Sequence, residues 1–473
     1  MENARVHLIG IGGIGLSAIA KVLLEEGHRV SGSDLKLSPI TDGLARLGAK
    51  VYKGHRADNV DDADLVVVSS AVPADNPEVI AAREKGVPVV KRDWMLGRMM
   101  EGRFGIAVAG SHGKTTITAM IALVLTEAGL DPSFIVGGIL ENLGTNAKAG
   151  RGEHFVIEAD EYDRTFLGLR PRIAVVTNIE MDHPDCYPEL DDLVEAFRDF
   201  LHLVPANGCI IGCGDEKRVR GILGAREQRS KGAGEQGPSV VTYGLNEGVD
   251  WQAVDIRSNE LGGSDFVALH EGQPVGKFAL RIPGLHNVQN ALAALAVSDY
   301  LGLDLTDVRE TLKRFQGVRR RFEVKGGVNG IVIIDDYAHH PTQIRATLAT
   351  ARKCYPDREI WAVFQPHTYS RTKALLDEFA GSFADADHVV VTDIYPAREF
   401  NDLGVSAADI VTRMKHPDAR YISGLNEAAD HLLNHLKPGD VLITLGAGDG
   451  HKVGEDVWVR LEEKGQGVVL TDE

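Results

Sequence analysis

The sequence predicts an α/β protein of three domains, in which parallel sheets alternate with helices. Its 473 residues correspond to about three domains at roughly 150 residues each. Short apolar runs typical of strands alternate with segments whose apolar residues recur at helical spacing, and glycine-rich turns join several of these pairs. We expect a Rossmann-like domain over 1–102, a central P-loop domain of the ATPase type with a parallel sheet over 103–317, and a second Rossmann-like α/β domain over 318–473.

Composition and charge exclude several classes of function. Hydrophobic residues make up 44% and charged residues 25% of the chain, which is normal for a globular protein. The net charge of −17 argues against nucleic acid as a partner, because phosphate backbones are bound by an excess of Lys and Arg. No apolar run approaches ~18 residues, and the N-terminus lacks the basic segment of a signal peptide, so we expect neither a membrane span nor export. The cysteines fit no disulfide or zinc pattern, which favours the cytoplasm: Cys186, Cys209, Cys213 and Cys354.

The first domain is predicted to open with the strand Val6–Ile9, followed by a glycine-rich turn and a helix. Glycines in such a turn let the backbone approach a diphosphate, and Asp34, about 20 residues further on, would face a ribose. Another predicted strand, Leu65–Val68, ends at the edge where open α/β sheets bind ligands. The expected diphosphate site contains Gly10, Gly12, Gly13, Ile14, Gly15, Asp34, Ser69 and Ser70. A Rossmann-like domain with an idle glycine turn is the alternative.

The segment 105–116 organises the rest of the prediction. It is a short apolar run that breaks into glycines and precedes a helix. The backbone N–H groups of such a loop and the positive end of the helix surround a phosphate, while Lys114 adds a full charge and the Thr115 hydroxyl can bind Mg²⁺. Val108 stands where the usual pattern has a glycine, so the loop is tighter. The expected nucleotide site contains Gly110, Ser111, His112, Gly113, Lys114, Thr115 and Thr116. A structural glycine turn is the alternative.

Two further strands of the central domain end in acidic residues and a histidine. Phe155–Ile157 leads into Glu158–Glu161, and Ile173–Val176 leads into Thr177–His183. Parallel strands interleaved with helices place these ends on the same side of the sheet as the phosphate loop. A lone histidine after a strand is usually a polar surface residue, but His183 at one edge with acids and a lysine favours metal and phosphate chemistry.

Later in the central domain, the amides Asn287 and Asn290 lie three residues apart at the start of an alanine-rich helix. At this spacing both can face one ligand, although helix capping explains them equally well. Residues 226–239 are rich in Gly, Gln, Lys and Arg, so we expect a mobile surface loop there.

The third domain is predicted to carry its polar residues at strand exits and has no phosphate loop of its own. Ile331–Ile334 is followed by Asp335–Pro341, in which the proline suits the first turn of a helix. Ile360–Phe364 is followed by Gln365–Thr372, which contains His and Arg side chains. Further strands are expected over His388–Thr392 and Val441–Leu445.

The predicted sites fit an ATP-using enzyme with a nucleotide-linked substrate. They comprise one nucleotide site, a separate diphosphate site, and a third domain that offers Arg and His side chains. Phosphoryl transfer needs mainly positioning and charge neutralisation, which Lys114, a metal and a mobile arginine such as Arg321 could supply. Two other classes stay open. An NAD-dependent oxidoreductase explains Gly10–Asp34 but gives Lys114 no task. A non-catalytic UDP-sugar sensor or ATPase switch uses both nucleotide sites but does not need the third domain's Arg and His.

Eight motifs, taken together, resemble the Mur ligases of bacterial cell-wall synthesis along the whole chain. They are Gly10–Gly15, Gly110–Thr116, Glu158–Glu161, Thr177–His183, His286–Asn290, Arg320–Glu323, Asp335–Pro341 and Gln365–Thr372. The resemblance implies that the first domain binds the UDP end of a sugar nucleotide and not NAD. It also implies ATP-dependent amide-bond formation through an acyl phosphate, in peptidoglycan synthesis.

Within that family the motifs are most similar to those of the members that join L-alanine to UDP-N-acetylmuramic acid, releasing ADP and phosphate. A murein-recycling ligase that adds a tripeptide to the same acceptor is the nearest alternative. The resemblance implies ATP and Mg²⁺ as cofactors, with two ions, and small-molecule substrates. It leaves a monomer and a homodimer open.

The resemblance also implies roles for individual residues. Lys114 would contact the β- and γ-phosphates, Thr115 and Glu158 would hold one Mg²⁺, and His183 would bind a second. The remaining positions of the ATP site would be Asn287, Asn290 near the adenine, Arg321, and Asp336 at the ribose. The incoming amino acid would lie among Tyr337, His339, His367 and Arg371. The catalytic residues would therefore be Lys114, Glu158, His183 and Arg321.

Three positions depart from the family pattern. Ser111 stands where many members have threonine, which keeps the hydroxyl. Thr368 stands where some members have arginine, so the carboxylate of the amino acid would rest on Arg371 alone. Tyr162 is more typical of the tripeptide ligase.

Overall fold

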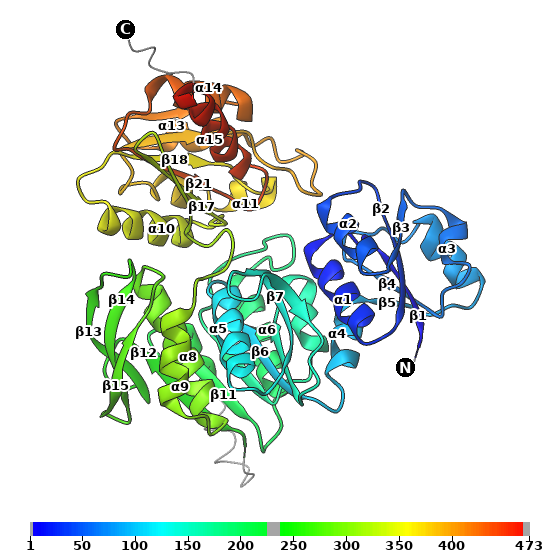
Figure 1. Ribbon diagram of the computed structural model, residues 1–473. Helices are drawn as coiled ribbons and strands as arrows, with labels where there is room; N and C mark the ends of the chain where they lie inside the picture. Colours follow the sequence, from blue (N-terminus) through cyan, green and yellow to red (C-terminus); the bar gives the residue numbers. More distant parts are fainter. Residues whose placement is uncertain (1–2, 225–236, 467–473) are drawn as a thin grey trace.

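The computed structural model describes residues 3–224 and 237–466, which form three α/β domains, each built around one sheet (Figure 1). The predicted fold class is confirmed. The segment 226–239 falls almost entirely outside the described residues, and its last residue, Ser239, begins a strand. Among the described residues all four cysteines are free, and no helix combines the length and the apolar character needed to cross a membrane.

The first domain is a five-stranded parallel sheet in the order β3-β2-β1-β4-β5. Its strands are β1 (Arg5–Ile9), β2 (Arg29–Asp34), β3 (Lys50–Lys53), β4 (Leu65–Val68) and β5 (Val89–Lys91). Its helices are α1 (Ile14–Glu25), α2 (Pro39–Arg46), α3 (Pro77–Glu84), α4 (Arg92–Met100) and the 3₁₀ turn η1 (Ala57–Val60). The strand order reverses at β1, so a crevice opens between the ends of β1 and β4, where Gly10 and Ser69 lie.

The central domain contains a 10-stranded sheet in the order β15-β14-β13-β12-β11-β10-β6-β9-β7-β8. Its strands are β6 (Phe104–Ala109), β7 (Ser133–Leu140), β8 (Thr145–Lys148), β9 (His154–Glu158), β10 (Ile173–Val176), β11 (Cys209–Cys213), β12 (Ser239–Gly244), β13 (Trp251–Ser258), β14 (Ser264–His270) and β15 (Gln273–Ala279). The part around β6 is parallel, as predicted. The sequence analysis missed the antiparallel extensions, β14 and β15 at one end and β8 at the other.

The helices of the central domain explain why its core strands are apolar on both faces. They are α5 (Lys114–Glu127), α6 (Leu190–His202), α8 (Leu285–Tyr300), α9 (Leu305–Arg314) and the 3₁₀ segment η2 (Tyr162–Gly168). Helix α5 is buried on nearly all sides because it lies between the sheet and α8, which explains its continuous apolar sequence.

The third domain has a six-stranded sheet in the order β16-β17-β21-β18-β19-β20, in which only β16 runs antiparallel. Its strands are β16 (Glu323–Val328), β17 (Ile331–Asp336), β18 (Ile360–Phe364), β19 (His388–Val391), β20 (Ala419–Tyr421) and β21 (Val441–Leu445). Its helices are α10 (Pro341–Cys354), α11 (Tyr369–Ala374), α12 (Leu376–Ala380), α13 (Ala407–Arg413), α14 (Leu425–His435) and α15 (His451–Gln466). Pro341 occupies the first turn of α10, as predicted.

The register of the central sheet brings the predicted functional segments together. Val108 of β6 pairs with Glu158 of β9, and Ala109 pairs with Val176 of β10. The phosphate loop and the two acidic segments therefore leave the sheet at one edge. The third domain faces this edge, with β17 and α10 directed toward it (Figure 1).

Two helical glycines of the first domain test the packing of α4 against η2. An alanine at Gly97 would place Cβ 2.2 Å from the carbonyl oxygen of Gly168, whereas a Cβ at Gly43 of α2 meets no atom within 4 Å. We expect Gly97→Ala to lower the free energy of unfolding by ~1–3 kcal/mol through overpacking. Gly43→Ala should raise it by ~0.5–1 kcal/mol, because alanine favours the helix. Thermal melting compares the two variants, and equal melting temperatures would contradict this packing.

Candidate active site

The phosphate loop is held in shape by the segment that follows β10. Gly110 has φ +135°, and a Cβ there would lie 1.9 Å from the Thr177 hydroxyl oxygen, so only glycine fits. The backbone N–H groups of Ser111 and His112 donate to the backbone and side-chain oxygens of Asn178, at 3.0 and 2.8 Å. The loop is thus fixed before any ligand binds.

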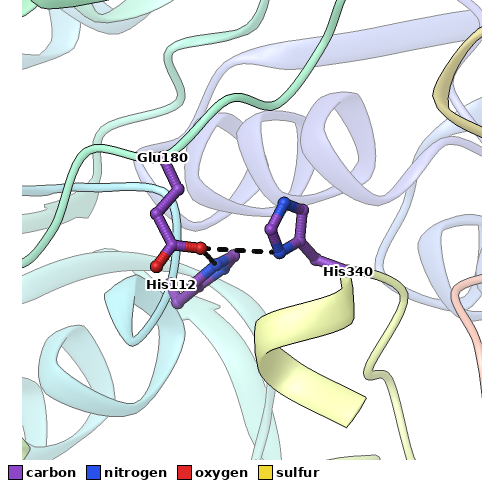
Figure 2. A group of neighbouring side chains, drawn as sticks. All are labelled: His112, Glu180 and His340. Atoms are coloured by element: carbon purple, nitrogen blue, oxygen red, sulfur yellow. Dashed lines mark hydrogen bonds and ion pairs between the residues drawn. The ribbon is translucent and has the colours of Figure 1, made fainter. Parts of the chain in front are cut away.

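The side chain of His112 leaves the loop toward the third domain. Its Nε2 lies 3.0 Å from a carboxylate oxygen of Glu180, and the Nδ1 of His340 lies 3.6 Å from the same oxygen (Figure 2). His112, Glu180 and His340 form one of two groups of described residues whose side-chain atoms are close enough to share a metal ion.

Lys114 is nearly buried at the start of α5. Its Nζ donates to the carbonyl oxygen of Gly110 at 2.6 Å and to the two carboxylate oxygens of Glu161 at 2.8 and 3.0 Å. Burial alone would lower the pKa of Lys114, but the carboxylates of Glu161 and Glu158 outweigh it and raise that pKa. The ammonium is therefore charged at neutral pH and directed into the loop.

Three carboxylates, those of Glu158, Asp160 and Glu161, lie around Lys114. Glu158 accepts the Thr115 hydroxyl at 3.0 Å and the Gly137 N–H at 2.7 Å. Asp160 is paired with Arg92 of the first domain at 2.7 Å. Burial would raise the pKa of Asp160, but Arg92 and Lys114 lower it overall, so the carboxyl group is ionised. These carboxylate oxygens are ligands of the kind that divalent cations prefer.

The second group that could hold a metal ion is Glu161, Asp182 and His183. The Nε2 atom of His183 lies 3.9 Å from Glu161 and 3.8 Å from Asp182. Of the predicted metal ligands, Thr115 and Glu158 are hydrogen-bonded to each other, whereas His183 sits with Glu161 and Asp182. Carboxylate and hydroxyl oxygens suit Mg²⁺, so the residues present fit this ion.

Asp182 was predicted only together with His183, as part of an edge suited to metal and phosphate chemistry, and Glu161 was given no individual role, although both lie inside the predicted motifs. Both follow the same strand ends as Glu158 and His183, and both are buried. The sheet-edge position was a signal that could have found them. Arg92 gave no such signal, because only the tertiary structure places it against Asp160.

Eight of the eleven predicted ATP residues line a cavity of about 260 Å³ between the central and third domains: His112, Gly113, Thr115, Thr116, Asn287, Asn290, Arg321 and Asp336. Ser111 and Lys114 line the neighbouring cavity of about 320 Å³, and Gly110 lines neither. Asn287 and Asn290 are joined by a 3.1 Å hydrogen bond and both are buried. The N-cap of α8 is Gly284, without a side-chain cap, so the two amides do not cap the helix. Facing the cavity, they are placed to contact a ligand.

Arg321 and Asp336 lie where the chain enters the third domain. Arg321 donates to the Thr115 hydroxyl at 3.1 Å, which joins the third domain's entry segment to the phosphate loop. Asp336 accepts the backbone N–H groups of Phe322 and Ala338 at 2.8 and 2.7 Å. Burial raises the pKa of Asp336, mostly opposed by Arg321.

The glycine-rich turn of the first domain opens toward the same reaction site. Ile14 and Gly15 line a cavity of about 320 Å³ that also contains Lys114, Glu158 and His183. Asp34 accepts the N–H of Gly12 at 3.0 Å, so its carboxylate supports the turn itself. The Ser69 hydroxyl lies beside Gly10, where a Cβ would approach it to 3.4 Å.

Gly13 and Ser70, which were also predicted for the diphosphate site, make structural contacts. Gly13 precedes α1 as its N-cap, with extended backbone angles. Ser70 donates to Asp163 of the central domain at 2.8 Å, and Lys91 reaches the same carboxylate at 2.9 Å. These bonds tie the ends of β4 and β5 to the central domain.

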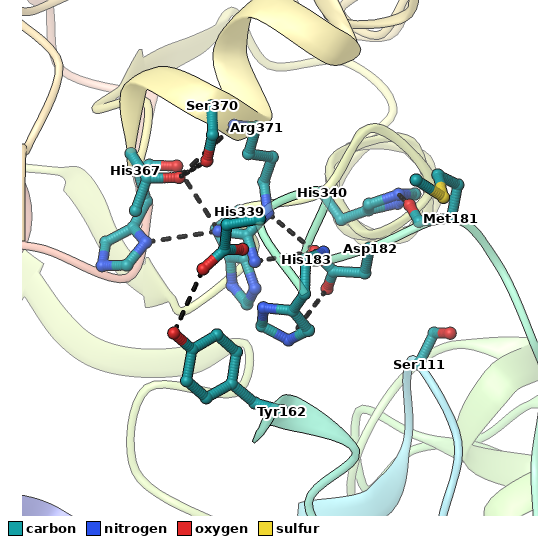
Figure 3. Close-up of polar contacts among 12 residues, drawn as sticks. Ser111, Tyr162, Met181, Asp182, His183, His339, His340, His367, Ser370 and Arg371 are labelled. Atoms are coloured by element: carbon teal, nitrogen blue, oxygen red, sulfur yellow. Dashed lines mark hydrogen bonds and ion pairs between the residues drawn. The ribbon is translucent and has the colours of Figure 1, made fainter. Parts of the chain in front are cut away.

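The predicted amino-acid residues meet at the far end of the larger cavity, which contains Tyr337, His339, His367 and Arg371 (Figure 3). Arg371 is paired with the buried Asp182 at 2.7 Å, and its NH1 lies 3.2 Å from His367. Burial would raise the pKa of Asp182, but Arg371 holds it well below its usual value. Burial and Arg371 lower the pKa of His367 to about 4, so this ring is neutral.

The three departures from the family pattern each have a local role. The Ser111 hydroxyl donates to the carbonyl oxygen of Glu180 at 3.0 Å. Thr368, at φ +67°, is the N-cap of α11 and accepts the N–H of Arg371. The Tyr162 hydroxyl donates to Asp185 at 3.1 Å, and its ring lies 5.0 Å from that of His183 (Figure 3).

Comparison with known families gives three matches in chain order. Residues 5–104 match the Mur ligase family catalytic domain, 108–298 the Mur ligase middle domain, and 320–448 the Mur ligase glutamate ligase domain. A UDP-N-acetylmuramate–L-alanine ligase from Geotalea daltonii is 46% identical and covers 97% of this chain and 98% of its own. One from Caldanaerobacter subterraneus is 45% identical, with coverage of 95% and 96%.

Solved structures agree with these sequence matches. The UDP-N-acetylmuramate-alanine ligase of Thermotoga maritima has a TM-score of 0.81 at 29% identity and covers 98% of this chain and 100% of its own. A murein peptide ligase from Psychrobacter arcticus has a TM-score of 0.74 at 27% identity, with coverage of 97% and 98%.

The pH dependence of stability tests whether His340 is buried and neutral. Burial and the neighbouring His112 lower the pKa of His340 to about 4, so the folded protein leaves this ring neutral where the unfolded chain takes up a proton. The contribution of His340 to stability is therefore present above pH ~6.5 and is lost as the pH falls toward ~4. Between pH 7 and pH 5 the loss is about 2 kcal/mol.

We expect His340→Asn to weaken this pH dependence, since asparagine does not titrate and is a good N-cap. Urea unfolding at pH 7 and pH 5, on wild type and variant, measures it. An unchanged difference between the two pH values would contradict a neutral, buried His340.

Proposed function

Because the chain belongs to the Mur ligase family, we propose that it joins L-alanine to the lactyl carboxylate of UDP-N-acetylmuramic acid, using ATP. The products are UDP-N-acetylmuramoyl-L-alanine, ADP and phosphate, and the reaction belongs to peptidoglycan synthesis. The observation that carries this proposal is the cavity shared by the three domains, which contains Gly15, Lys114 and Arg371. It offers a site for each of the three substrates around one reaction centre.

The reaction proceeds in two balanced steps. A lactyl carboxylate oxygen attacks the γ-phosphorus of ATP, and the bond between that phosphorus and the bridging β-phosphate oxygen breaks. ADP is released, and the sugar nucleotide now carries an acyl phosphate. The amine of L-alanine then attacks the acyl carbon, loses a proton and displaces phosphate. Lys114, held by Glu161, stabilises the negative charge on the transferring phosphoryl group.

Two divalent cations fit the charge of the site. Mg²⁺, when bound, neutralises the phosphate and carboxylate groups that would otherwise repel each other. Thr115 and Glu158 would hold one ion, and His183, with Glu161 beside it, would hold the second.

The other side chains bind and orient the substrates. Asn287 and Arg321 would contact the nucleotide, with Asn290 on the adenine side and Asp336 at the ribose. Gly10–Gly15, Asp34, Ser69 and Ser70 would form the UDP-sugar site of the first domain. Tyr337, His339, His367 and Arg371 would surround L-alanine, and Asp182 fixes the guanidinium that faces its carboxylate.

The competing functions lack comparable support. Asp34 supports its own loop, so nothing at the first domain specifically favours NAD. A tripeptide-adding ligase is a weaker candidate. A relative named UDP-N-acetylmuramate–L-alanine ligase is 46% identical over 97% of this chain, and a solved alanine ligase has a TM-score of 0.81 against 0.74 for a solved murein peptide ligase. We place the reaction in the cytoplasm, where ATP and UDP-linked sugars occur, carried out by domains 1–102, 103–317 and 318–473.

Dependence on all substrates is the first test. We expect phosphate release to require ATP, Mg²⁺, UDP-N-acetylmuramic acid and L-alanine together, because each step consumes the product of the one before. A coupled assay with single omissions, and with glycine, L-serine and the tripeptide in place of L-alanine, measures this. Rapid turnover with the tripeptide but not L-alanine would contradict the proposal, as would reduction of NAD.

Lys114→Ala tests the division of labour between domains. We expect the rate of ADP formation to fall by about 10³-fold or more, because a preorganised charge on the transferring group is lost. UDP-N-acetylmuramic acid should still bind, as measured by calorimetry. Lys313→Ala, an exposed lysine on α9, is the matched control and should leave both quantities unchanged. Loss of UDP-sugar binding in Lys114→Ala would contradict the separate sites.

A further inference from the structure

Three consecutive residues of the central domain are each bonded to the third domain. The Thr342 hydroxyl donates to the Glu180 carboxylate at 2.7 Å, the Nε2 of His340 contacts the carbonyl oxygen of Met181 at 3.1 Å, and Arg371 pairs with Asp182. We call residues 180–182 the docking strap. The next residue along the chain is His183, the candidate metal ligand, so the third domain holds the segment that leads into it (Figure 3).

A second set of bonds runs from the third domain to the phosphate loop. The Oε1 atom of Gln343 accepts the backbone N–H groups of His339 and His340, at 2.9 and 3.2 Å. These donors fix the orientation of the amide, so its Nε2 must donate to the Nδ1 of His112 at 3.0 Å. The proton of His112 then lies on Nε2 and is donated to Glu180 (Figure 2).

The proton on Nε2 of His112 decides whether the three residues in Figure 2 can bind a metal ion. His112, Glu180 and His340 are residue types that bind metals, but a metal would need the Nε2 lone pair of His112, which carries a proton here. The Nε2 of His340 donates to a carbonyl oxygen, and its Nδ1 accepts the N–H of Thr342 at 3.3 Å. Each ring nitrogen is thus satisfied by a hydrogen bond, and the group is an interdomain network.

We propose that Thr342 and Gln343, in the first turn of α10, are positioning residues that couple docking of the third domain to the phosphate loop and to His183. The proposal rests on the proposed function, since it concerns the ATP and metal sites. Thr342→Val keeps the N-cap bond of α10, because the side chain of His340 accepts the backbone N–H of Thr342 and not its hydroxyl. Gln343 completes the capping box of α10, because its Oε1 accepts the N–H of His340.

The coupling has a defined route on each side. In the phosphate loop, the carbonyl oxygen of His112 accepts a hydrogen bond from the Thr177 hydroxyl at 2.5 Å. The backbone of His112 is therefore fixed by the central domain, and its imidazole is fixed by the third domain. At the strap, Asp182 accepts the N–H of His183 at 2.8 Å and stabilises its left-handed backbone at φ +57°. Undocking would free the His112 imidazole from Gln343 and the Asp182 carboxylate from Arg371 together, while these bonds inside the central domain remain.

The test uses Thr342→Val and Gln343→Met, which remove the donors and keep the side-chain size, and the double variant. Gln343→Met also removes the Oε1 acceptor of the capping box, so the exchange of α10 peptides is followed as well. Thr412→Val is the control, because its hydroxyl bonds only within α13. We expect kcat to fall by about 10- to 100-fold in the double variant, the loss typical of hydrogen bonds to charged or reacting groups. The dissociation constant for UDP-N-acetylmuramic acid should stay within about twofold, because that ligand binds the first domain.

Hydrogen exchange supplies the second readout. Peptides spanning 180–187 should exchange faster in the double variant than in wild type or Thr412→Val, while peptides from β11 should not change. Unchanged exchange at 180–187 would overturn the proposal, and faster exchange everywhere would show general destabilisation instead and equally overturn it.

A double-mutant cycle separates positioning from direct nucleotide contact, since Thr342 and Gln343 also line the nucleotide cavity. Gln343→Met and His112→Gln should cost no more in kcat together than the larger single loss, because both break one connection. Additive losses would overturn the coupling. Failure of the proposed function would appear separately, as a wild-type enzyme that does not need L-alanine.

Discussion

The buried ammonium of Lys114 is the interaction on which the rest of the site depends. It is held between the carbonyl oxygen of Gly110 and the carboxylate of Glu161, with Glu158 and Asp160 close by. Arg92 pairs with Asp160 and Arg371 with Asp182, so the carboxylates of Glu158 and Glu161 are left to share Lys114. The phosphate and carboxylate groups of the substrates add negative charge to this site, which bound divalent cations would neutralise.

The third domain supplies what the central domain lacks. Arg371 neutralises Asp182 across the interface, so the pair removes one carboxylate from the negative charge around Lys114. Thr342 and Gln343 reach Glu180 and His112 from the same side. In this structure the side chains of the third domain therefore complete the reaction centre, and domains held together around it would exclude water from an acyl phosphate.

Much of this arrangement could be predicted from the sequence, because parallel strands place their ends together. Gly110, Glu158 and His183 each follow a short apolar run, and this pattern alone brings them to one edge. The antiparallel strands β14 and β15 were missed, since their pairing depends on partners and not on local pattern. The partner of Arg371 was missed for the same reason, because Asp182 is 189 residues away in the chain.

Activation of the sugar nucleotide's carboxylate by direct phosphorylation is the step on which the proposed reaction depends. It is tested by labelling both lactyl carboxylate oxygens of UDP-N-acetylmuramic acid with ¹⁸O and running the reaction with ATP and L-alanine. An acyl phosphate transfers one labelled oxygen to the released phosphate, which mass spectrometry or ³¹P NMR detects. Phosphate carrying one ¹⁸O per turnover is the result predicted here, and unlabelled phosphate would contradict the account.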